Sequence, residues 1–228
     1  MVDDGAHAGV TASALGTAWC PGTALAAAEH LLGAVEPKSG TLLLDLVAGL
    51  GHCAGLATRR GVIATGMDSC AQRLDTARRR YPQALFYTGE PDSLVFADAF
   101  FSTVTHHAGP GQAPSPTALA EAYRVLMPGG RHAALCLGAP AAPESLGGDR
   151  GRPSGAHQDA GAALRARWEA AGFEQVQVTE AHIDWQPTDT LDVPMATAPS
   201  AGHPPVFVKG TPPCLRWTAL LVSGAKRG

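Results

Sequence analysis

The sequence predicts a single α/β domain built on an open, mostly parallel sheet with helices on both faces. Two short apolar runs bounded by turn signals, residues 41–47 and 62–67, are typical of strands that are buried on both sides. Strand-like and helix-like segments alternate up to residue 137, which indicates right-handed crossovers between parallel strands. A chain of 228 residues, 45% of them hydrophobic, is long enough for one such domain with a well-filled core.

Seven strands are expected, at residues 41–47, 62–67, 84–87, 102–105, 132–137, 176–185 and 215–222. Helical patterns cover residues 23–35, the stretch after the first glycines up to 60, a segment ending at 81, a segment from 115 that stops before 128, and one through 164 and 168 that ends at 172. Ser69 with Gln72 predicts a capping box for the third helix. Ser115 followed by Pro116 predicts the start of the fourth.

Glycine and proline are unusually frequent, at 27 and 18 residues. Apart from the glycines after the first strand, they concentrate in segments 109–116, 138–153 and 187–213. We expect a domain core over about 23–137, with 138–228 supplying substrate-side loops and the C-terminal strands. Because open sheets bind ligands beyond the carboxyl ends of their strands, these segments are expected to flank the site. Only 16% of residues are charged, which suits an apolar ligand.

Charge and cysteine usage disfavour several classes of partner. The net charge is −3, and no basic run is longer than residues 78–80, so nucleic acid is not expected as a partner. The five cysteines are odd in number and never spaced C-x-x-C, which argues against a disulfide framework and a zinc knuckle. No leader or long apolar run is present, so we expect a cytoplasmic protein that does not enter a membrane. Its assembly as a homodimer is left open.

Glycines stand where the first strand passes into its helix. Gly49 and Gly51 let the backbone approach a ligand closely, and the helix N-terminus beyond them offers N–H groups. Asp68 ends the second strand, where a carboxylate can hold ribose hydroxyls. The alternative is that the glycines serve only a tight turn between strand and helix.

Segments 44–51, 65–69, 86–96 and 120–131 together resemble the class I S-adenosylmethionine-dependent methyltransferases, particularly the small-molecule type similar to ubiquinone and menaquinone biosynthesis enzymes. Residues 44–51 look like the family loop hydrophobic-Asp-x-Gly-x-Gly-x-Gly. Residues 120–131 are similar to the helix and turn before the family's fifth strand. The resemblance covers roughly residues 23–137. It implies a Rossmann-like, seven-stranded sheet whose last strand is antiparallel.

The resemblance implies S-adenosylmethionine as the cofactor. Asp68 would bind both ribose hydroxyls, and Glu90 would stand near the adenine amine in place of the family's Asp. The full set implied for cofactor binding is Asp45, Val47, Ala48, Gly49, Gly51, Asp68, Ser69 and Glu90. Val47 departs from the family pattern, which has glycine there, and its β-branched side chain would project where the methionine part of the cofactor packs. Pro91 and Ser102 are further departures.

Two histidines, His106 and His107, end the fourth strand at the rim where the family places substrate and the transferring methyl group. Histidine suits a general base near neutral pH. Because neighbouring strand residues point to opposite faces, at most one of the two is expected to face the pocket, and with no third ligand at suitable spacing no metal site is predicted. Trp19 and Trp185 either cover an apolar ligand or belong to the core. Cys53 opens the second helix, whose N-terminus would lower a thiol pKa, or it simply packs.

Three functions follow from these observations. The favoured one is a methyltransferase that uses S-adenosylmethionine on an apolar small molecule in bacterial secondary metabolism, with His106 or His107 as the base. The alternative is a methyltransferase-like enzyme that transfers no methyl group and catalyses a pericyclase-type cyclisation of a polyketide-like substrate. A third is a non-catalytic binding or regulatory subunit that keeps the fold.

Overall fold

The computed structural model describes residues 21–108, 112–137, 155–185 and 215–228. In chain order its elements are α1 (Pro21–Val35), β1 (Leu42–Leu46), α2 (His52–Arg59), β2 (Ile63–Asp68), α3 (Ala71–Arg80), β3 (Leu85–Thr88), β4 (Phe101–Ala108), α4 (Pro116–Val125), β5 (Leu126–Leu137), α5 (Gly155–Ala170), β6 (Glu174–Trp185) and β7 (Leu215–Ala225). Trp19 and the side chain of Trp185 lie outside what is described.

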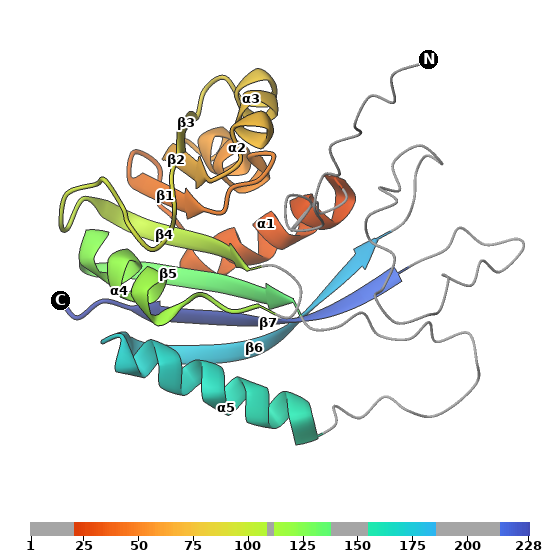
Figure 1. Ribbon diagram of the computed structural model, residues 1–228, viewed down its shortest axis with the longest axis vertical. Helices are drawn as coiled ribbons and strands as arrows, with labels where there is room; N and C mark the ends of the chain where they lie inside the picture. The colour runs from red at the N-terminus through yellow and green to blue at the C-terminus, as the bar shows by residue number, and fades with distance from the viewer. Residues whose placement is uncertain (1–20, 109–111, 138–154, 186–214) are drawn as a thin grey trace, which may run out of the picture.

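The seven strands form one sheet in the order β3-β2-β1-β4-β5-β7-β6 (Figure 1). The pairs from β3 to β5 are parallel, whereas β7 runs antiparallel to both β5 and β6. The predicted fold class, including the antiparallel last strand, is confirmed. The chain leaves β1 toward β2 on one side and returns to β4 on the other, so β1 and β4 flank the point where the strand order reverses. Ligands of open α/β sheets bind at such a point.

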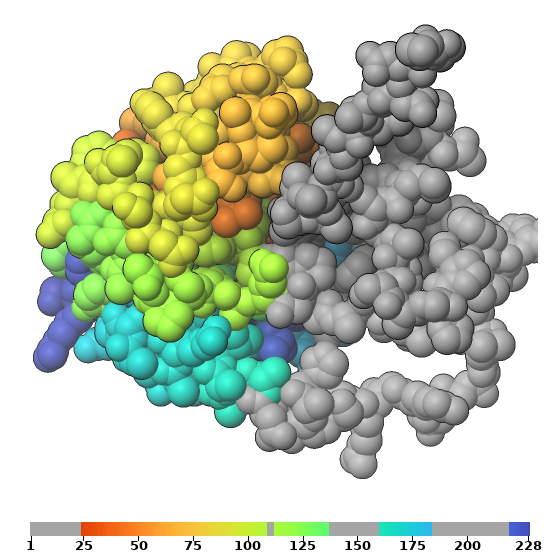
Figure 2. Space-filling view, in the orientation of Figure 1, coloured from red at the N-terminus to blue at the C-terminus, as the bar shows by residue number. Residues whose placement is uncertain are grey.

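Helices cover both faces of the sheet. Buried residues of α1, α2 and α3 form one apolar cluster with one side of the strands, and α4 and α5 form a second cluster with the other side. Figure 2 shows the outer surface of that second layer, with α5 in cyan below α4 in green. Trp168 of α5 is fully buried beneath it. Among the described residues, no helix is both long and apolar enough to cross a bilayer.

Four strands, β4 to β7, are longer than the sequence pattern indicates, and β4 and β5 differ most. β4 extends over Phe101–Ala108 because it pairs along its length with β5 and, through its middle residues 103–106, with β1. β5 begins at Leu126, directly after α4, and its first residue pairs with Phe101. The added residues at the start of β5 include proline and glycine, and those at the end of β4 include two histidines. Pairing with a neighbouring strand, and not local periodicity, defines both extensions.

Local capping follows one prediction and departs from another. Ser115 caps α4, and its hydroxyl oxygen accepts a hydrogen bond from the Ala118 N–H, as predicted. The predicted capping box at Ser69 is wrong, because α3 begins at Ala71 and has no side-chain cap bond at its N-cap residue, Cys70. The Cys70 N–H donates instead to the Asp68 carboxylate, at 2.8 Å. The acid that ends β2 therefore also anchors the start of α3.

Candidate functional site

A pocket lies beyond the carboxyl ends of β1 and β4, where the reversal of strand order predicts a site. Its walls come from the ends of these strands, from the turn after β3 and from the segment that leads into α4. The lining residues are Val47, Pro91, Asp92, His106, His107, Ala108, Gln112, Ala113, Pro114, Ser115 and Ala118. Residues 112–116 belong to the first glycine- and proline-rich segment, which was expected to flank the site.

Both histidines of β4 line this pocket, although only one was expected to. They do lie on opposite sides of the sheet, since His107 approaches Asp45 and His106 contacts the ring of His132. Because the pocket lies past the end of the strand, both residues still reach its wall. Burial lowers the pKa of His106 to about 4 and that of His107 to about 3, so both rings are neutral near pH 7.

His132 is a buried neighbour of the site that the sequence reading did not single out. The Trp168 Nε1–H donates to His132 Nδ1 at 3.0 Å, which puts the proton of the neutral ring on Nε2. The ring is stacked against both Trp168 and Phe173. Within the described part of the chain, His132 Nε2 and His106 Nδ1 have no hydrogen-bond partner. His132 looks like an ordinary strand residue in the sequence, and only the contact with α5 distinguishes it.

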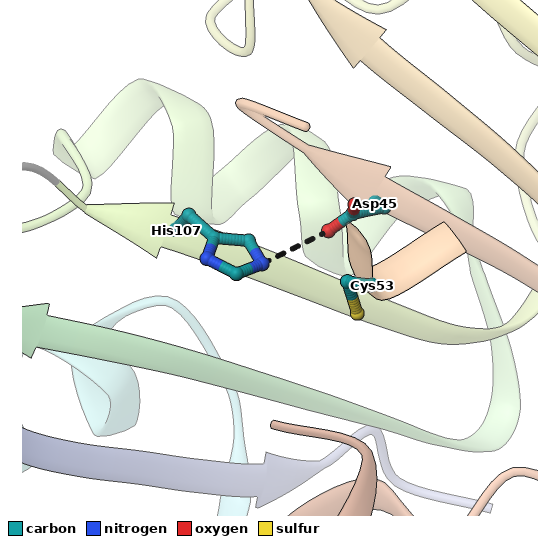
Figure 3. A group of neighbouring side chains, drawn as sticks. All are labelled: Asp45, Cys53 and His107. Carbon is teal, nitrogen blue, oxygen red and sulfur yellow. Dashed lines mark ion pairs between the residues drawn. The ribbon is translucent and has the colours of Figure 1, made fainter. Parts of the chain in front are cut away.

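Asp45 lies in the core beneath the pocket, with no exposed surface. The Thr105 hydroxyl donates to Asp45 Oδ1 at 2.9 Å, and His107 Nε2 lies 3.6 Å from the same oxygen (Figure 3). Burial raises the pKa of Asp45 to about 7. Cys53 Sγ lies 3.4 Å from the Thr105 hydroxyl, and burial raises the pKa of its thiol. The helix N-terminus therefore does not lower the pKa of the Cys53 thiol.

The loop after β1 keeps the backbone shape of a glycine loop. Val47 has φ 57°, in the left-handed region that a β-branched residue rarely adopts. Val47 also lines the pocket. Ala48 is buried and its N–H donates to the Met67 carbonyl at 2.9 Å. A Cβ at Gly51 would meet Phe86 and Ala77 within 3 Å, so this glycine serves packing, whereas a Cβ at Gly49 would meet nothing within 4 Å. Only Gly49 leaves backbone open to a ligand.

Asp68, the acid expected to bind ribose, is already engaged by the protein. Its Oδ2 accepts from the Gly49 N–H at 2.9 Å, and its Oδ1 accepts from the Cys70 N–H and from Arg73 Nη2 at 2.6 Å. The side chain of Asp68 has no exposed surface and that of Arg73 is 20% exposed. Ser69 and Glu90 are exposed and do not line the pocket.

The residues around Asp68 and Gly49 fit an adenosine-containing cofactor, provided that one neighbouring side chain at each end of the cofactor leaves enough room. At the ribose end, the two backbone N–H groups fix the Asp68 carboxylate in place, but the guanidinium of Arg73 must move away before hydroxyl groups can reach it. At the other end, the open backbone of Gly49 permits a close approach, while the side chain of Val47 narrows the space. The fit therefore depends on where the side chains of Arg73 and Val47 lie.

Comparisons with known proteins agree with this geometry. Residues 44–134 match the family described as Methyltransferase domain. A demethylmenaquinone methyltransferase of Beutenbergia cavernae is 34% identical over 101 residues, which cover 44% of this chain and 42% of that protein. The chain thus matches less than half the length of this curated relative.

Two solved structures share the fold. The YcgJ protein of Bacillus subtilis superposes with a TM-score of 0.61 at 17% identity, covering 89% of this chain and 98% of that one. The (4+2)-cyclase SpnF superposes with a TM-score of 0.51 at 24% identity, covering 68% of this chain and 59% of that one. At these identities the likeness concerns the fold, and the chemistry has to be argued from the site.

Proposed function

We propose that this chain, whose residues 44–134 match the family described as Methyltransferase domain, is a class I S-adenosylmethionine-dependent methyltransferase that methylates an apolar small molecule in bacterial secondary metabolism. The observation that carries this proposal is the pocket itself. It lies beside the glycine loop, its wall is largely apolar, and two neutral histidines line it. The similarity to a demethylmenaquinone methyltransferase favours a flat, ring-containing acceptor of the quinol type.

The chemistry requires little more than positioning from the protein. S-adenosylmethionine, when bound, supplies an activated methyl group. Methyl transfer is an in-line displacement, so its rate depends mainly on how the acceptor atom is held. Gly49 and Asp68 would hold the cofactor, and Val47 and Pro114 would press the acceptor into place from the pocket wall.

A proton must leave a hydroxyl acceptor during the transfer, and the two histidines can receive it. Their pKa values, near 4 and 3, make them weak bases at neutral pH. They can accept a proton only as the methyl group bonds to the acceptor oxygen and makes its hydroxyl strongly acidic. Asp45 Oδ1, 3.6 Å from His107 Nε2, would stabilise the imidazolium that results.

Two side chains that stand in the way of the cofactor favour a second function. Val47 occupies pocket wall where the family has glycine, and Arg73 covers Asp68. A pericyclase-type cyclisation of a polyketide-like substrate needs a shaped apolar pocket and no methyl donor. For this alternative, Val47 would be part of the substrate wall.

Calorimetric titration with S-adenosylmethionine separates the two functions. We expect micromolar binding to the wild-type protein, and at least about tenfold tighter binding to Val47→Gly, because the change removes a side chain from the cradle and a strained φ worth about 1–3 kcal/mol. Val95→Gly, at an exposed valine that does not line the pocket, serves as the control and should bind like the wild type. If the wild type does not bind at millimolar cofactor while Val47→Gly does, methyl transfer by the natural protein is refuted and the cyclase remains.

A further inference from the structure

We propose that Asp45, Cys53 and His107 form a binding site for a divalent transition metal ion of the zinc type, beneath the inner end of the pocket. One carboxylate oxygen, one sulfur and one imidazole nitrogen, all from buried residues, lie within 4.8 Å of one another. They come from β1, from the first turn of α2 and from β4, and Figure 3 shows His107 and Asp45 facing each other with Cys53 beside them. The proposed methyl transfer uses the contact between His107 and Asp45 but gives Cys53 no role, so the gathering of all three side chains needs a separate explanation.

The donor set itself selects the class of metal. Zn²⁺ and Co²⁺ accept mixed sulfur, nitrogen and oxygen ligands in tetrahedral geometry, whereas Mg²⁺ and Ca²⁺ prefer oxygen ligands alone. Closing the three donor atoms around one ion requires a contraction of about 1 Å, since ligand atoms in a tetrahedral zinc site lie roughly 3.2–3.7 Å apart. Side-chain rotations provide a movement of this size.

Hydrogen bonding within the cluster leaves one atom unexplained. Thr105 donates to Asp45 Oδ1 and also lies beside Cys53, so it orients two of the three donors. The Ala54 N–H and the Cys53 thiol lie close to the Asp45 carboxyl, but none of the described residues makes a hydrogen bond of good geometry to its buried Oδ2. A buried carboxylate oxygen without a donor is costly, and such an atom commonly indicates an ion or ordered water. A metal ion bound to Oδ2 would remove that cost.

The pocket provides access to the site. His107 is the member of the cluster that lines the pocket, whereas Asp45 and Cys53 lie deeper. Its neutral imidazole is the form that binds metal ions. Binding would release the thiol proton of Cys53 to solvent, and also the proton of Asp45 where that carboxyl is protonated. Three protein ligands leave a fourth position for water or a ligand in the pocket. With a metal bound, His106 is the histidine that stays available as a base.

Titration of the chelator-treated protein with Co²⁺ tests the proposal directly. We expect one Co²⁺ per chain, with the near-ultraviolet absorption of a thiolate–cobalt bond, and displacement by Zn²⁺. Cys53→Ser should abolish that absorption, and Asp45→Asn and His107→Gln should each weaken Zn²⁺ affinity about 100-fold. Cys136→Ser, at a buried cysteine of β5 outside the cluster, is the matched control and should bind like the wild type.

Cysteines outside the described residues require a second control. Cys20→Ser and Cys214→Ser should leave the absorption unchanged, and circular dichroism should show that all variants are folded. The proposal is overturned if the absorption persists in Cys53→Ser, or if the folded wild type binds Co²⁺ no better than the folded Asp45→Asn variant. Because the readout is metal binding alone, neither result depends on whether the protein transfers methyl groups.

Discussion

Arg73 decides whether Asp68 can accept hydrogen bonds from a cofactor ribose. Its guanidinium donates to Asp68 Oδ1 from Nη2 at 2.6 Å and from Nε at 3.1 Å, and it covers a carboxylate that has no exposed surface. The hydroxyl groups of a bound ribose would therefore compete with Arg73 for this carboxylate. We predict that Arg73→Met, which keeps an unbranched helix-forming side chain but removes the charge, raises the affinity for S-adenosylmethionine.

The magnitude follows from the bonds that the cofactor no longer has to break. Hydrogen bonds to charged groups contribute about 1.5–3 kcal/mol, so removing this competition should tighten binding roughly 10- to 100-fold. Asp68 itself should stay in place, since the N–H groups of Gly49 and Cys70 still hold its two oxygens at 2.9 and 2.8 Å. The protein without cofactor should lose stability by about 1 kcal/mol, because a partly buried ion pair is gone.

Calorimetric titration and thermal melts of Arg73→Met, with and without cofactor, measure both effects. Arg79→Met is the matched control, because Arg79 lies on the same helix, is exposed and bonds only to the Thr76 hydroxyl among the described contacts. Its affinity should equal that of the wild type. Weaker binding by Arg73→Met would mean that Arg73 itself contacts the cofactor, and unchanged binding would mean that Asp68 takes no part; either result refutes the reasoning.

Two further predictions concern the buried histidines. Replacing His106 or His107 by Gln should lower the turnover of labelled methyl transfer about 100-fold or more without unfolding the protein, and unchanged turnover in both variants would remove histidine from the mechanism. Stability to urea should fall as the pH is lowered from about 6.5 toward 4, because burial lowers the pKa of His106 to about 4 and of His107 and His132 to about 3, while the unfolded chain takes up protons at its ordinary pKa. Asp45, whose pKa is raised to about 7, acts in the opposite direction over pH 4–7 and offsets only one of these protons. A urea midpoint that stays constant or rises between pH 7 and pH 5 would contradict this assignment.

The sequence predicted those elements that depend on interactions between residues close together in the chain. The apolar run of β1 and the alternation of strands and helices after it predicted the observed parallel sheet, because a strand buried on both faces needs such a run. The cap at Ser115 is likewise local, since its hydroxyl and the Ala118 N–H are three residues apart. The cap at Ser69 failed for a related reason: Asp68, one residue earlier, already receives the Cys70 N–H.

The site was predictable only in part, because most of its contacts join distant segments. Strand ends pointed to Val47, His106 and His107, all of which line the pocket. The contact of Asp45 with Thr105 links residues 60 apart, and that of Trp168 with His132 links residues 36 apart. Neither the periodicity of apolar residues nor the spacing of motifs predicts contacts between residues so far apart in the sequence. Arg73 looked like one more exposed helix residue, and its position over Asp68 follows from the start of α3.

The strand order also has a consequence for how the chain assembles as it leaves the ribosome. β6 is made before β7, yet β7 is its only neighbour in the sheet and separates it from β5. Until residues 215–225 emerge, β5 has an unpaired edge and β6 has no neighbouring strand in the described sheet with which to pair. Synthesis from the N-terminus can therefore complete only the five strands from β3 to β5 before β7 is made. The remaining strands should join together, late and as one unit, which makes β7 the strand whose loss a truncated product could least tolerate.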